Sequence, residues 1–226
     1  PARPALPLRD IHVSYFARGQ EIKAVRGVNL TVHAGETLAL VGESGSGKSS
    51  VAFAAMRGLD AAGRLMRGSI HFNDIDLLTL GPRELRRLQG SRIAMVYQEL
   101  NLVPDLTVAE NISLGDVPSR FGIVDRKALR ARAERVLDEL DARVRPDDLV
   151  GSLSVSQQQM VEIAKVLSHR SRILIMDEPT AALNDKEIDE LFAIIDRLRA
   201  EGVGIVYISH KMDEIKRISD RITVMR

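Results

Sequence analysis

At 226 residues, the chain can bury a sizeable hydrophobic core, as one large domain or as a core domain with a small appended subdomain. Its 32 Lys and Arg residues nearly balance its 31 Asp and Glu residues, so the net charge of +1 does not favour nucleic acid as a partner. Zero cysteines exclude disulfides and cysteine nucleophiles. The sequence has no apolar run of ~20 residues and no apolar core in residues 1–7, so we expect any membrane role to act through a partner.

Two segments near the N-terminus alternate apolar and polar residues in the manner of strands. They are residues 11–15 and 28–32, and the second ends at the turn Ala34-Gly35. An antiparallel sheet at the start of the chain is therefore predicted.

A phosphate-binding pattern follows. Residues 42–49 fit G-x-x-x-x-G-K-[ST] at every fixed position, with an apolar run at 37–41 before them and a helix-compatible segment at 50–56 after them. Backbone N–H groups of such a loop and the N-terminus of the helix face a bound anion. Lys48 would reach the β- and γ-phosphates, and the Ser49 hydroxyl would ligate Mg²⁺. The alternative is a plain Gly/Ser-rich turn, which would not require Lys-Ser after its last glycine.

The same loop predicts a nucleotide as ligand. Tyr15 lies between the first strand and the loop at 17–20, where its ring could stack on an adenine; an ordinary strand aromatic is the alternative. The residues predicted to bind ATP in this part of the chain are Tyr15, Gly42, Glu43, Ser44, Gly45, Ser46, Gly47, Lys48, Ser49 and Ser50.

The next segments return to the sheet. Residues 68–72 are predicted to form a strand, and Pro82 opens a short basic helix over 83–88. The apolar run at 92–97 ends at Gln98. A polar amide at the carboxyl end of a core strand lies where open α/β sheets bind ligands, so Gln98 could contact Mg²⁺ or the attacking water.

From residue 100 to 150 the periodicity is helical. Thr107 and Glu110 form a capping box. Further along, five apolar residues share one helical face: Leu129, Ala133, Val136, Leu137 and Leu140. We interpret the basic side of this helix as a solvated face; contact with a partner protein or acidic headgroups is the alternative.

Another helix is predicted after residue 156, because Met160, Ile163, Ala164 and Leu167 share a face. Ser154 or Ser156 would cap it, and its N-terminus could bind an anion. Capping alone is the competing interpretation.

The run at 172–176 leads into paired acids, which is typical of a parallel strand buried on both faces. Asp177 would hold Mg²⁺. Glu178 would orient a water and partly deprotonate it for in-line attack on the γ-phosphate. A buried strand ending in a solvated Asp-Glu turn is the alternative. Asn184 and Glu187 then form a second capping box.

A last apolar strand at 203–209 ends in His210, which is thereby placed at the same edge as Gln98, Asp177 and Glu178. We expect His210 to contact the γ-phosphate. The predicted catalytic residues are Glu178, His210, Gln98 and Lys48, and the predicted metal ligands are Ser49, Gln98 and Asp177.

Taken together, these motifs resemble the ATP-binding cassette family over essentially the whole chain. Besides the phosphate loop, the resemblance includes the glutamine loop at Gln98, the signature at residues 153–157, the acidic strand end at 177–178 and the switch histidine at His210. It implies an α/β P-loop NTPase with a mainly parallel core sheet, an N-terminal antiparallel β subdomain and an inserted helical subdomain. Residues 1–226 would form a single nucleotide-binding domain, with its ATP-binding core at 1–98 and 151–226 and the helical subdomain at 99–150.

The resemblance also implies partners and a location. In that family, signature residues bind the γ-phosphate of ATP held by another cassette, so two cassettes close head to tail. Here the corresponding residues are Ser154, Val155, Ser156 and Gln157. The remaining partners would be transmembrane permease subunits, which places the chain as a peripheral protein on the cytoplasmic face of the membrane.

Within the family, different parts of the chain resemble two kinds of importer. Residues up to about Gln98 are similar to dipeptide and oligopeptide importer cassettes, whereas those from Glu99 onward are similar to monosaccharide importers of the ribose and xylose type. We therefore favour an ATPase subunit for monosaccharide uptake, with peptide uptake as the alternative. A non-transport cassette ATPase acting on nucleic acid or ribosomes is an alternative of another class.

Two residues depart from the family pattern. Ser156 stands where the signature usually has glycine, and Asn184 stands where aspartate is common. Both departures leave open a cassette that binds ATP and dimerises but hydrolyses slowly.

Overall fold

The computed structural model describes residues 4–89, 91–97, 100–120, 122–169 and 171–226. The chain divides into two compact units. The first comprises Pro1–Met95, Ser171–Glu178 and Asp196–Arg226, and the second comprises Val96–Arg170 and Pro179–Ile195.

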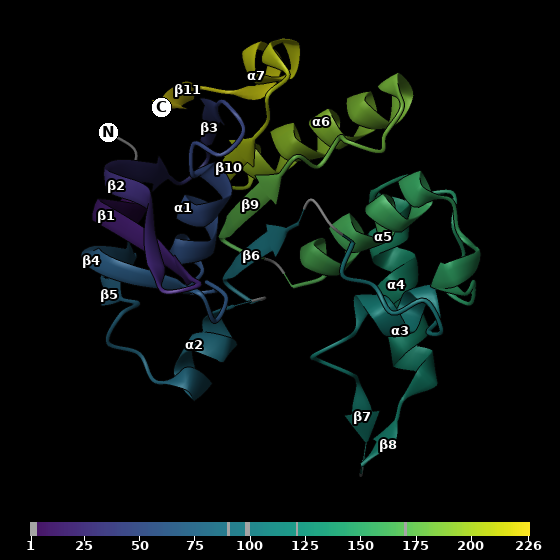
Figure 1. Ribbon diagram of the computed structural model, residues 1–226. Helices are drawn as coiled ribbons and strands as arrows, with labels where there is room; N and C mark the ends of the chain where they lie inside the picture. Colours follow the sequence, from purple (N-terminus) through teal and green to yellow (C-terminus); the bar gives the residue numbers. More distant parts are fainter. Residues whose placement is uncertain (1–3, 90, 98–99, 121, 170) are drawn as a thin grey trace. The chain divides into compact units, whose positions relative to one another are not determined.

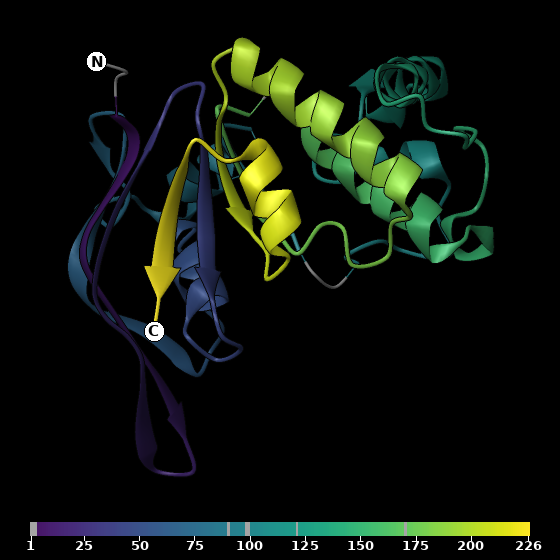
Figure 2. The ribbon, with the colours of Figure 1, turned by 90° about the horizontal axis from the view of Figure 1, so that it is seen from above.

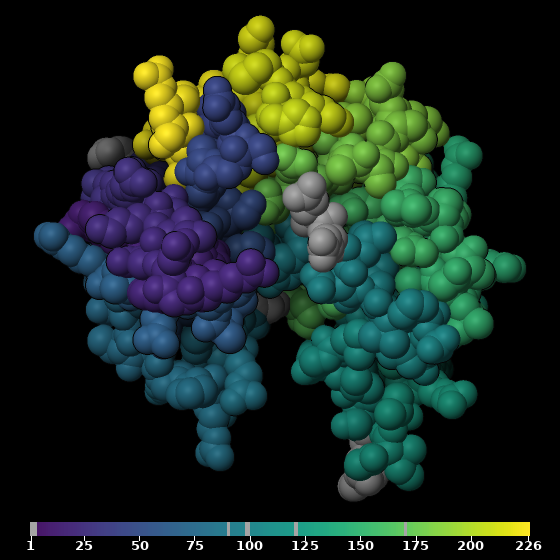
Figure 3. Space-filling model, viewed as in Figure 1, coloured from purple at the N-terminus to yellow at the C-terminus, as the bar shows by residue number. Residues whose placement is uncertain are grey.

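The first unit begins with an antiparallel sheet. Its strands are β1 (Pro4–Ala17), β2 (Gln20–His33), β4 (Gly63–Phe72) and β5 (Ile75–Asp76), in the order β2-β1-β4-β5. β1 and β2 form one long, curved hairpin (Figure 2), and their residues, in purple, make a continuous part of the surface in Figure 3. The turn has positive φ at both Arg18 and Gly19, the geometry that matches the twist of hairpin strands. The predicted antiparallel sheet is confirmed, with longer strands than 11–15 and 28–32.

The second sheet contains β3 (Thr37–Gly42), β6 (Ile93–Val96), β9 (Ile173–Asp177), β10 (Gly204–Ile208) and β11 (Arg221–Met225), in the order β11-β3-β10-β9-β6 (Figure 1). β3, β9, β10 and β11 pair in parallel. All residues of β9 and β10 are buried, as expected of strands covered on both faces. In the register, Ile208 lies opposite both Leu40 and Asp177, so the carboxyl ends of β3, β9 and β10 meet at one edge.

Three helices accompany these sheets: α1 (Lys48–Ala55), α2 (Pro82–Leu88) and α7 (Met212–Ile218). α1 packs against β1, β2 and β3. α2 begins at Pro82 as predicted, and the Gly81 N–H donates to the Glu84 carboxylate at 3.1 Å. The mainly parallel sheet beside an antiparallel one confirms the α/β class with a phosphate loop between β3 and α1.

The second unit is mostly helical. It contains α3 (Val108–Ile112), α4 (Arg126–Glu139), the 3₁₀ turn η1 (Val150–Ser152), α5 (Val155–Leu167) and the first part of α6 (Asp185–Ala200). The five residues of the predicted apolar face of α4 are all buried. The Thr107–Glu110 capping box is present, with the Thr107 N–H donating to Glu110 at 2.8 Å.

One element of this unit departs from the predicted helical periodicity. β7 (Ser119–Arg120) and β8 (Ile123–Val124) form a small antiparallel hairpin. With two residues in each strand, the hairpin is too short for an alternating pattern to reveal it.

The second unit is also larger than the helical subdomain expected at 99–150, because α5 packs with both α3 and α4. The division into an ATP-binding core and a helical subdomain stays a prediction.

Candidate functional site

The phosphate loop connects buried β3 to α1. Lys48 is the first residue of α1 and is almost wholly buried. Its Nζ donates to the carbonyl oxygens of Gly42 and Glu43, at 2.9 Å each, so the lysine side chain folds over the loop. Glu43, Ser44 and Gly45 lie exposed at the outside of the turn. The loop therefore carries a buried cation that is hydrogen-bonded to two of its own carbonyl groups.

Gly47 is required by two features of this loop. It is the N-cap of α1 with φ of +90°, a conformation that side chains disfavour. A Cβ at Gly47 would also lie 2.5 Å from the carbonyl oxygen of Ala24 on β2. Only glycine lets the loop turn into the helix this close to the neighbouring sheet.

The hydroxyl of Ser46 lies in the same loop. Its Oγ is buried, and among the described residues it has no hydrogen-bond partner. The α1 N-terminus likewise has no side-chain cap and no acidic residue in its first turn. Unsatisfied donors at a helix N-terminus, together with Lys48, fit an anion such as a phosphate group.

Asp177 ends β9 and is 4% exposed. Burial raises the pKa of its carboxyl group, the hydrogen bond from the Ser49 side chain lowers that pKa, and the charges of Glu178 and Lys48 act in opposite directions. A hydroxyl and a desolvated carboxylate thus meet beside the phosphate loop. Oxygen ligands of this kind suit Mg²⁺, whose charge would offset the cost of burying the carboxylate.

Glu178 follows in an unusual backbone conformation, with φ of +46°. Its N–H donates to the Ile208 carbonyl at 2.9 Å, which ties this turn to β10. Its Oε1 lies 3.0 Å from Nδ1 of His210, an exposed side chain. The sequence prediction that β9 and β10 bring these two residues to one edge is therefore confirmed.

Glu214, which was not predicted from the sequence, stabilises the turn that carries His210. The Tyr207 and Ser209 hydroxyls both donate to Glu214 Oε2, at 2.9 and 3.2 Å, and the Lys211 N–H donates to Ser209 Oγ at 3.1 Å. The available signal was an acidic residue shortly after His210, since acids favour the first turn of a helix. That this acid is buried under the histidine turn depends on tertiary packing.

Tyr15 lies near the end of β1 and is half-buried. The Ser50 hydroxyl donates to its Oη at 3.3 Å, so the ring lies beside the first turn of α1. A Cβ at Gly63 on β4 would lie 2.9 Å from the ring, and Gly63 thereby leaves space for it. The structure brings Tyr15 to the loop, and adenine stacking stays a prediction. The predicted role of Gln98 lies outside the described residues.

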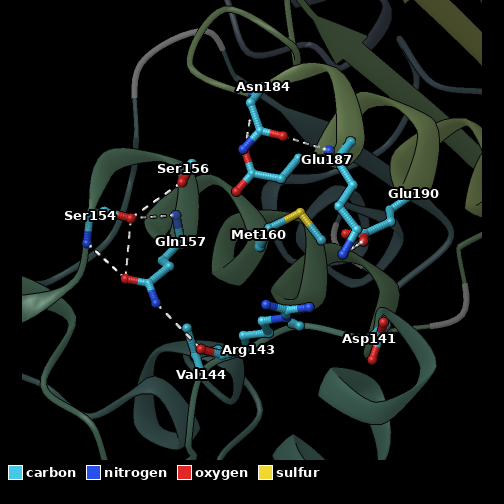
Figure 4. A pocket seen from close by; sticks show the side chains of 12 residues that line it. Asp141, Arg143, Val144, Ser154, Ser156, Gln157, Met160, Asn184, Glu187 and Glu190 are labelled. Carbon is cyan, nitrogen blue, oxygen red and sulfur yellow. Dashed lines mark hydrogen bonds and ion pairs between the residues drawn. The ribbon is translucent and has the colours of Figure 1, made fainter.

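The signature residues belong to the second unit, at the N-terminus of α5 (Figure 4). Ser154 is the N-cap: its Oγ accepts from the Gln157 N–H at 3.3 Å, and the Ser154 N–H donates to Gln157 Oε1 at 3.0 Å. Ser156 Oγ lies 3.2 Å from Ser154 Oγ. Val155, between them, is 59% exposed. Capping of α5 by Ser154 is thus confirmed, one serine hydroxyl contacts the other, and anion binding at this helix end stays a prediction.

These serines line a cavity of about 340 Å³, which Gln157, Arg143, Asn184 and Glu187 also border (Figure 4). Asn184 and Glu187 form the predicted capping box at the start of α6, with bonds of 3.0 and 3.1 Å. The cavity wall therefore has two capped helix ends and the guanidinium of Arg143. It is open enough to admit a polar ligand.

Comparison with known proteins identifies the class. A family model described as ABC transporter matches residues 25–181, and the chain belongs to this family. Among solved structures, it is similar to the dimeric bacterial ABC transporter cassette MJ0796, with a TM-score of 0.85 and 27% identity over 97% of this chain and 94% of that one. A post-hydrolysis state of that cassette, bound to ADP and Pi, matches with a TM-score of 0.86 and 27% identity over 98% and 94% of the two chains.

Curated relatives come from sugar import systems. The chain is 45% identical to ribose import ATP-binding protein RbsA 1 of Rubrobacter xylanophilus over 224 residues, which are 99% of this chain and 43% of the relative. It is 49% identical to a putative ribose/galactose/methyl galactoside import ATP-binding protein of Albidiferax ferrireducens, over 91% of this chain and 40% of that one. The first alignment includes the N-terminal part for which a resemblance to peptide importers was expected. The chain spans less than half the length of the curated relatives it matches.

Proposed function

We propose that this chain is the ATP-binding and ATP-hydrolysing cassette of an importer, and that it couples hydrolysis to uptake of a monosaccharide. The observation that carries the proposal is the contact of Glu178 with His210, at 3.0 Å, beside the joined side chains of Ser49 and Asp177. Phosphoryl transfer to water requires a general base, a polar contact for the γ-phosphate and ligands for a metal ion. Glu178, His210 and the Ser49–Asp177 pair would fill these three roles.

In this proposal, binding of ATP begins at the phosphate loop. Lys48 exchanges the carbonyl oxygens of Gly42 and Glu43 for charged phosphate oxygens, which are stronger acceptors. The N–H groups at the start of α1 face the same phosphates. Tyr15 stacks on the adenine, and Ser50 hydrogen-bonds the tyrosine. Mg²⁺, when bound, would neutralise charge on the β- and γ-phosphate oxygens, and Ser49, Asp177 and Gln98 would hold it.

Glu178 then acts on the attacking water. Its carboxylate orients the water in line with the γ-phosphorus and accepts a proton as the new P–O bond forms. The bond to the β-phosphate oxygen breaks, and ADP leaves with the electron pair. His210, which contacts Glu178 in the structure, turns to the γ-phosphate and releases the carboxylate for the water.

The signature end of α5 supplies the second half of a composite site. Ser154 and its neighbours lie at an exposed helix N-terminus, where a phosphate held by another cassette would find hydroxyl and N–H donors. Two cassettes therefore assemble head to tail around two nucleotides. The similarity to a dimeric cassette supports this arrangement.

Transport needs a membrane partner. No helix in the part of the chain that the structure describes has the length and apolar character to span a bilayer. We propose that transmembrane permease subunits supply the path and that this cassette docks on them as a peripheral protein at the cytoplasmic face. Monosaccharide uptake is favoured over peptide uptake because curated relatives at 44–49% identity are named for ribose and related sugars.

The Glu178→Gln variant tests the hydrolytic role. The substitution keeps the shape of the side chain but removes its basicity, so ATP binding persists while turnover falls by roughly 10²-fold or more. Calorimetry with Mg²⁺ and ATP measures binding, and phosphate release measures turnover. Unchanged hydrolysis would remove Glu178 from its role. Absence of binding heat with well-folded wild-type protein would reject the whole proposal.

A further inference from the structure

Glu214 is an acidic residue in the interior of the first unit. It lies in the first turn of α7 and is 7% exposed, beside the buried Ile215 on the same helix. Asp213, its neighbour in the same turn, is exposed and places a negative charge at the same helix end without burial. Because burying a carboxylate costs free energy, a charge at the helix end does not explain why Glu214 is buried.

The partners of Glu214 lie on both sides of His210. Its Oε2 accepts hydrogen bonds from the hydroxyls of Tyr207 and Ser209, at 2.9 and 3.2 Å, and its Oε1 lies 3.1 Å from Nζ of Lys211. The backbone N–H of Lys211 donates in turn to Ser209 Oγ at 3.1 Å. One carboxylate thereby holds the residues immediately before and after the histidine.

The position of His210 depends on these contacts because its own side chain is exposed. Ser209 is 2% exposed and bonds inward to Glu214, whereas the side chain of His210 is 66% exposed. The imidazole nevertheless lies 3.0 Å from the Glu178 carboxylate. An exposed side chain has few packing neighbours, so the backbone that carries it largely sets which groups it can reach.

We propose that Glu214 is a positioning residue for ATP hydrolysis, which fixes the backbone of His210 so that the imidazole can reach Glu178 and the γ-phosphate in turn. This inference rests on the proposed function and deepens it. Glu214 acts through His210 and is not itself a catalytic residue. A displacement of about 1 Å in a reacting group can lower a rate by about 10²-fold, whereas the affinity for ATP arises at the phosphate loop. Loss of Glu214 should therefore lower kcat and leave ATP binding intact.

Two variants remove the contacts of the carboxylate. Glu214→Gln removes the buried charge and keeps the size of the side chain, and Asp213→Asn, the same change at an exposed position of the same turn, is its control. Ser209→Ala removes the hydroxyl that joins Glu214 to the Lys211 N–H, and it tests the same contacts if Glu214→Gln does not fold. Its control is Ser219→Ala at the other end of α7, where the hydroxyl donates to a backbone carbonyl at 2.6 Å.

The first measurement is hydrogen exchange of the Lys211 backbone N–H in the full, nucleotide-free chain, followed by NMR. We expect this exchange to be about tenfold faster in Glu214→Gln and Ser209→Ala, because the hydrogen bond that holds the N–H is weakened or lost. The backbone N–H of Ser219, which closes the last turn of α7, should exchange at the wild-type rate in both variants. Asp213→Asn should leave both rates unchanged.

The second measurement separates positioning from a loss of structure. Single-turnover ATP hydrolysis should be about tenfold slower in both test variants, while the Kd of ATP from calorimetry stays within about twofold of wild type. In a His210→Ala background, the same substitutions should slow hydrolysis no further, because Glu214 acts only through the histidine. Both control variants should hydrolyse ATP at the wild-type rate.

Three results would overturn the inference. They are unchanged exchange at Lys211 in both test variants, unchanged hydrolysis, and an equal further loss of hydrolysis in the His210→Ala background, which would mean a structural role that does not act through the histidine. The exchange measurement needs no nucleotide and does not depend on the proposed function. If the wild-type chain does not hydrolyse ATP, the proposed function fails and the catalytic role of Glu214 fails with it, whereas the exchange rate still decides whether Glu214 holds the turn.

Discussion

The two compact units present their polar groups in different ways. In the first, each candidate catalytic side chain in the described chain already contacts another group of the same unit: Lys48 the loop carbonyls, Ser49 the Asp177 carboxylate, and Glu178 the imidazole of His210. In the second, Ser154 and Ser156 lie at an exposed helix end on the wall of an open cavity. The first unit holds these side chains in contact with one another or with the backbone, whereas the second presents its serine hydroxyls at an accessible helix end.

The difference between the two units follows from the cost of burying polar groups without partners. Buried polar groups are expensive to leave unsatisfied, so Lys48, Ser49 and Asp177 are held in contact with other groups of the first unit. The exposed Ser154 can be solvated as well as bonded within its own helix end. Substitutions in the first unit should therefore have large effects in the isolated chain, and those at the signature should have smaller effects that depend on association.

The largest effect on the first unit is expected from Gly47→Ala. The substitution places a Cβ on a left-handed backbone and 2.5 Å from the Ala24 oxygen, and we expect it to lower the free energy of unfolding by about 3 kcal/mol. Gly45→Ala is the matched control: its φ is +82°, but a Cβ there meets nothing within 4 Å, and about 1 kcal/mol is expected. Denaturant unfolding measures both. Equal losses would show that the close approach has no cost.

Lys48→Ala removes the cation of the preorganised loop. We expect ATP to bind about 10- to 100-fold more weakly, because a charge-assisted hydrogen bond to a phosphate is lost. The control is Lys216→Met, which changes an exposed lysine of α7 in the same unit. Isothermal titration gives both affinities. Wild-type affinity in Lys48→Ala would contradict the phosphate-loop interpretation.

Ser156→Gly tests the exposed serine pair of the second unit. It removes one of the partners of the Ser154 hydroxyl, the other being Gln157, and restores the backbone access of a glycine. In a Glu178→Gln background, ATP-dependent association of two cassettes should become about fivefold tighter, the worth of one hydrogen bond. Ser156→Ala retains the Cβ and distinguishes the hydroxyl from the backbone. Weaker association of Ser156→Gly, measured by sedimentation, would assign the serine pair a binding role instead.

The smallest effect is expected at the capping box of α3. Thr107→Ala should lower stability by about 0.5–1 kcal/mol near neutral pH. The bond from the Thr107 backbone N–H, followed by that from its hydroxyl, lowers the pKa of Glu110. Glu110 therefore stabilises the fold above its ordinary pKa, and this contribution is lost as pH falls through the lowered value. Unfolding curves of Glu110→Gln and wild type should converge in acid, and a gap that widens in acid would contradict the assignment.

The sequence predicted the first unit better than the second, for a physical reason. Buried parallel strands are read from uninterrupted apolar runs, and their register forces their ends to one edge; this is why Asp177, Glu178 and His210 were placed correctly. Capping boxes are equally local, and those at Thr107 and Asn184 were both predicted. For α5 the sequence left Ser154 and Ser156 as alternative caps, and the structure shows that Ser154 is the N-cap.

Tertiary interactions escaped sequence reasoning. Glu214 and Glu162 look like ordinary helical acids until the structure shows them buried against a turn and against the Asn101 backbone. The two-residue strands of β7 and β8 carry no periodic signal. For the two acids the deciding contact joins different elements, whose proximity no local pattern encodes, whereas the β7–β8 hairpin is local but too short to show a period.

The hydrogen bonds from the Tyr207 and Ser209 hydroxyls to Glu214 affect how fast the His210 side chain can change its partner. With the turn from Tyr207 to Lys211 held in place, His210 can change its partner by rotation about its own side-chain bonds alone. Exposed side chains change rotamer within picoseconds to nanoseconds, whereas loop rearrangements take up to microseconds. In the proposed function, the contact of His210 with the γ-phosphate is therefore not limited by motion of the main chain.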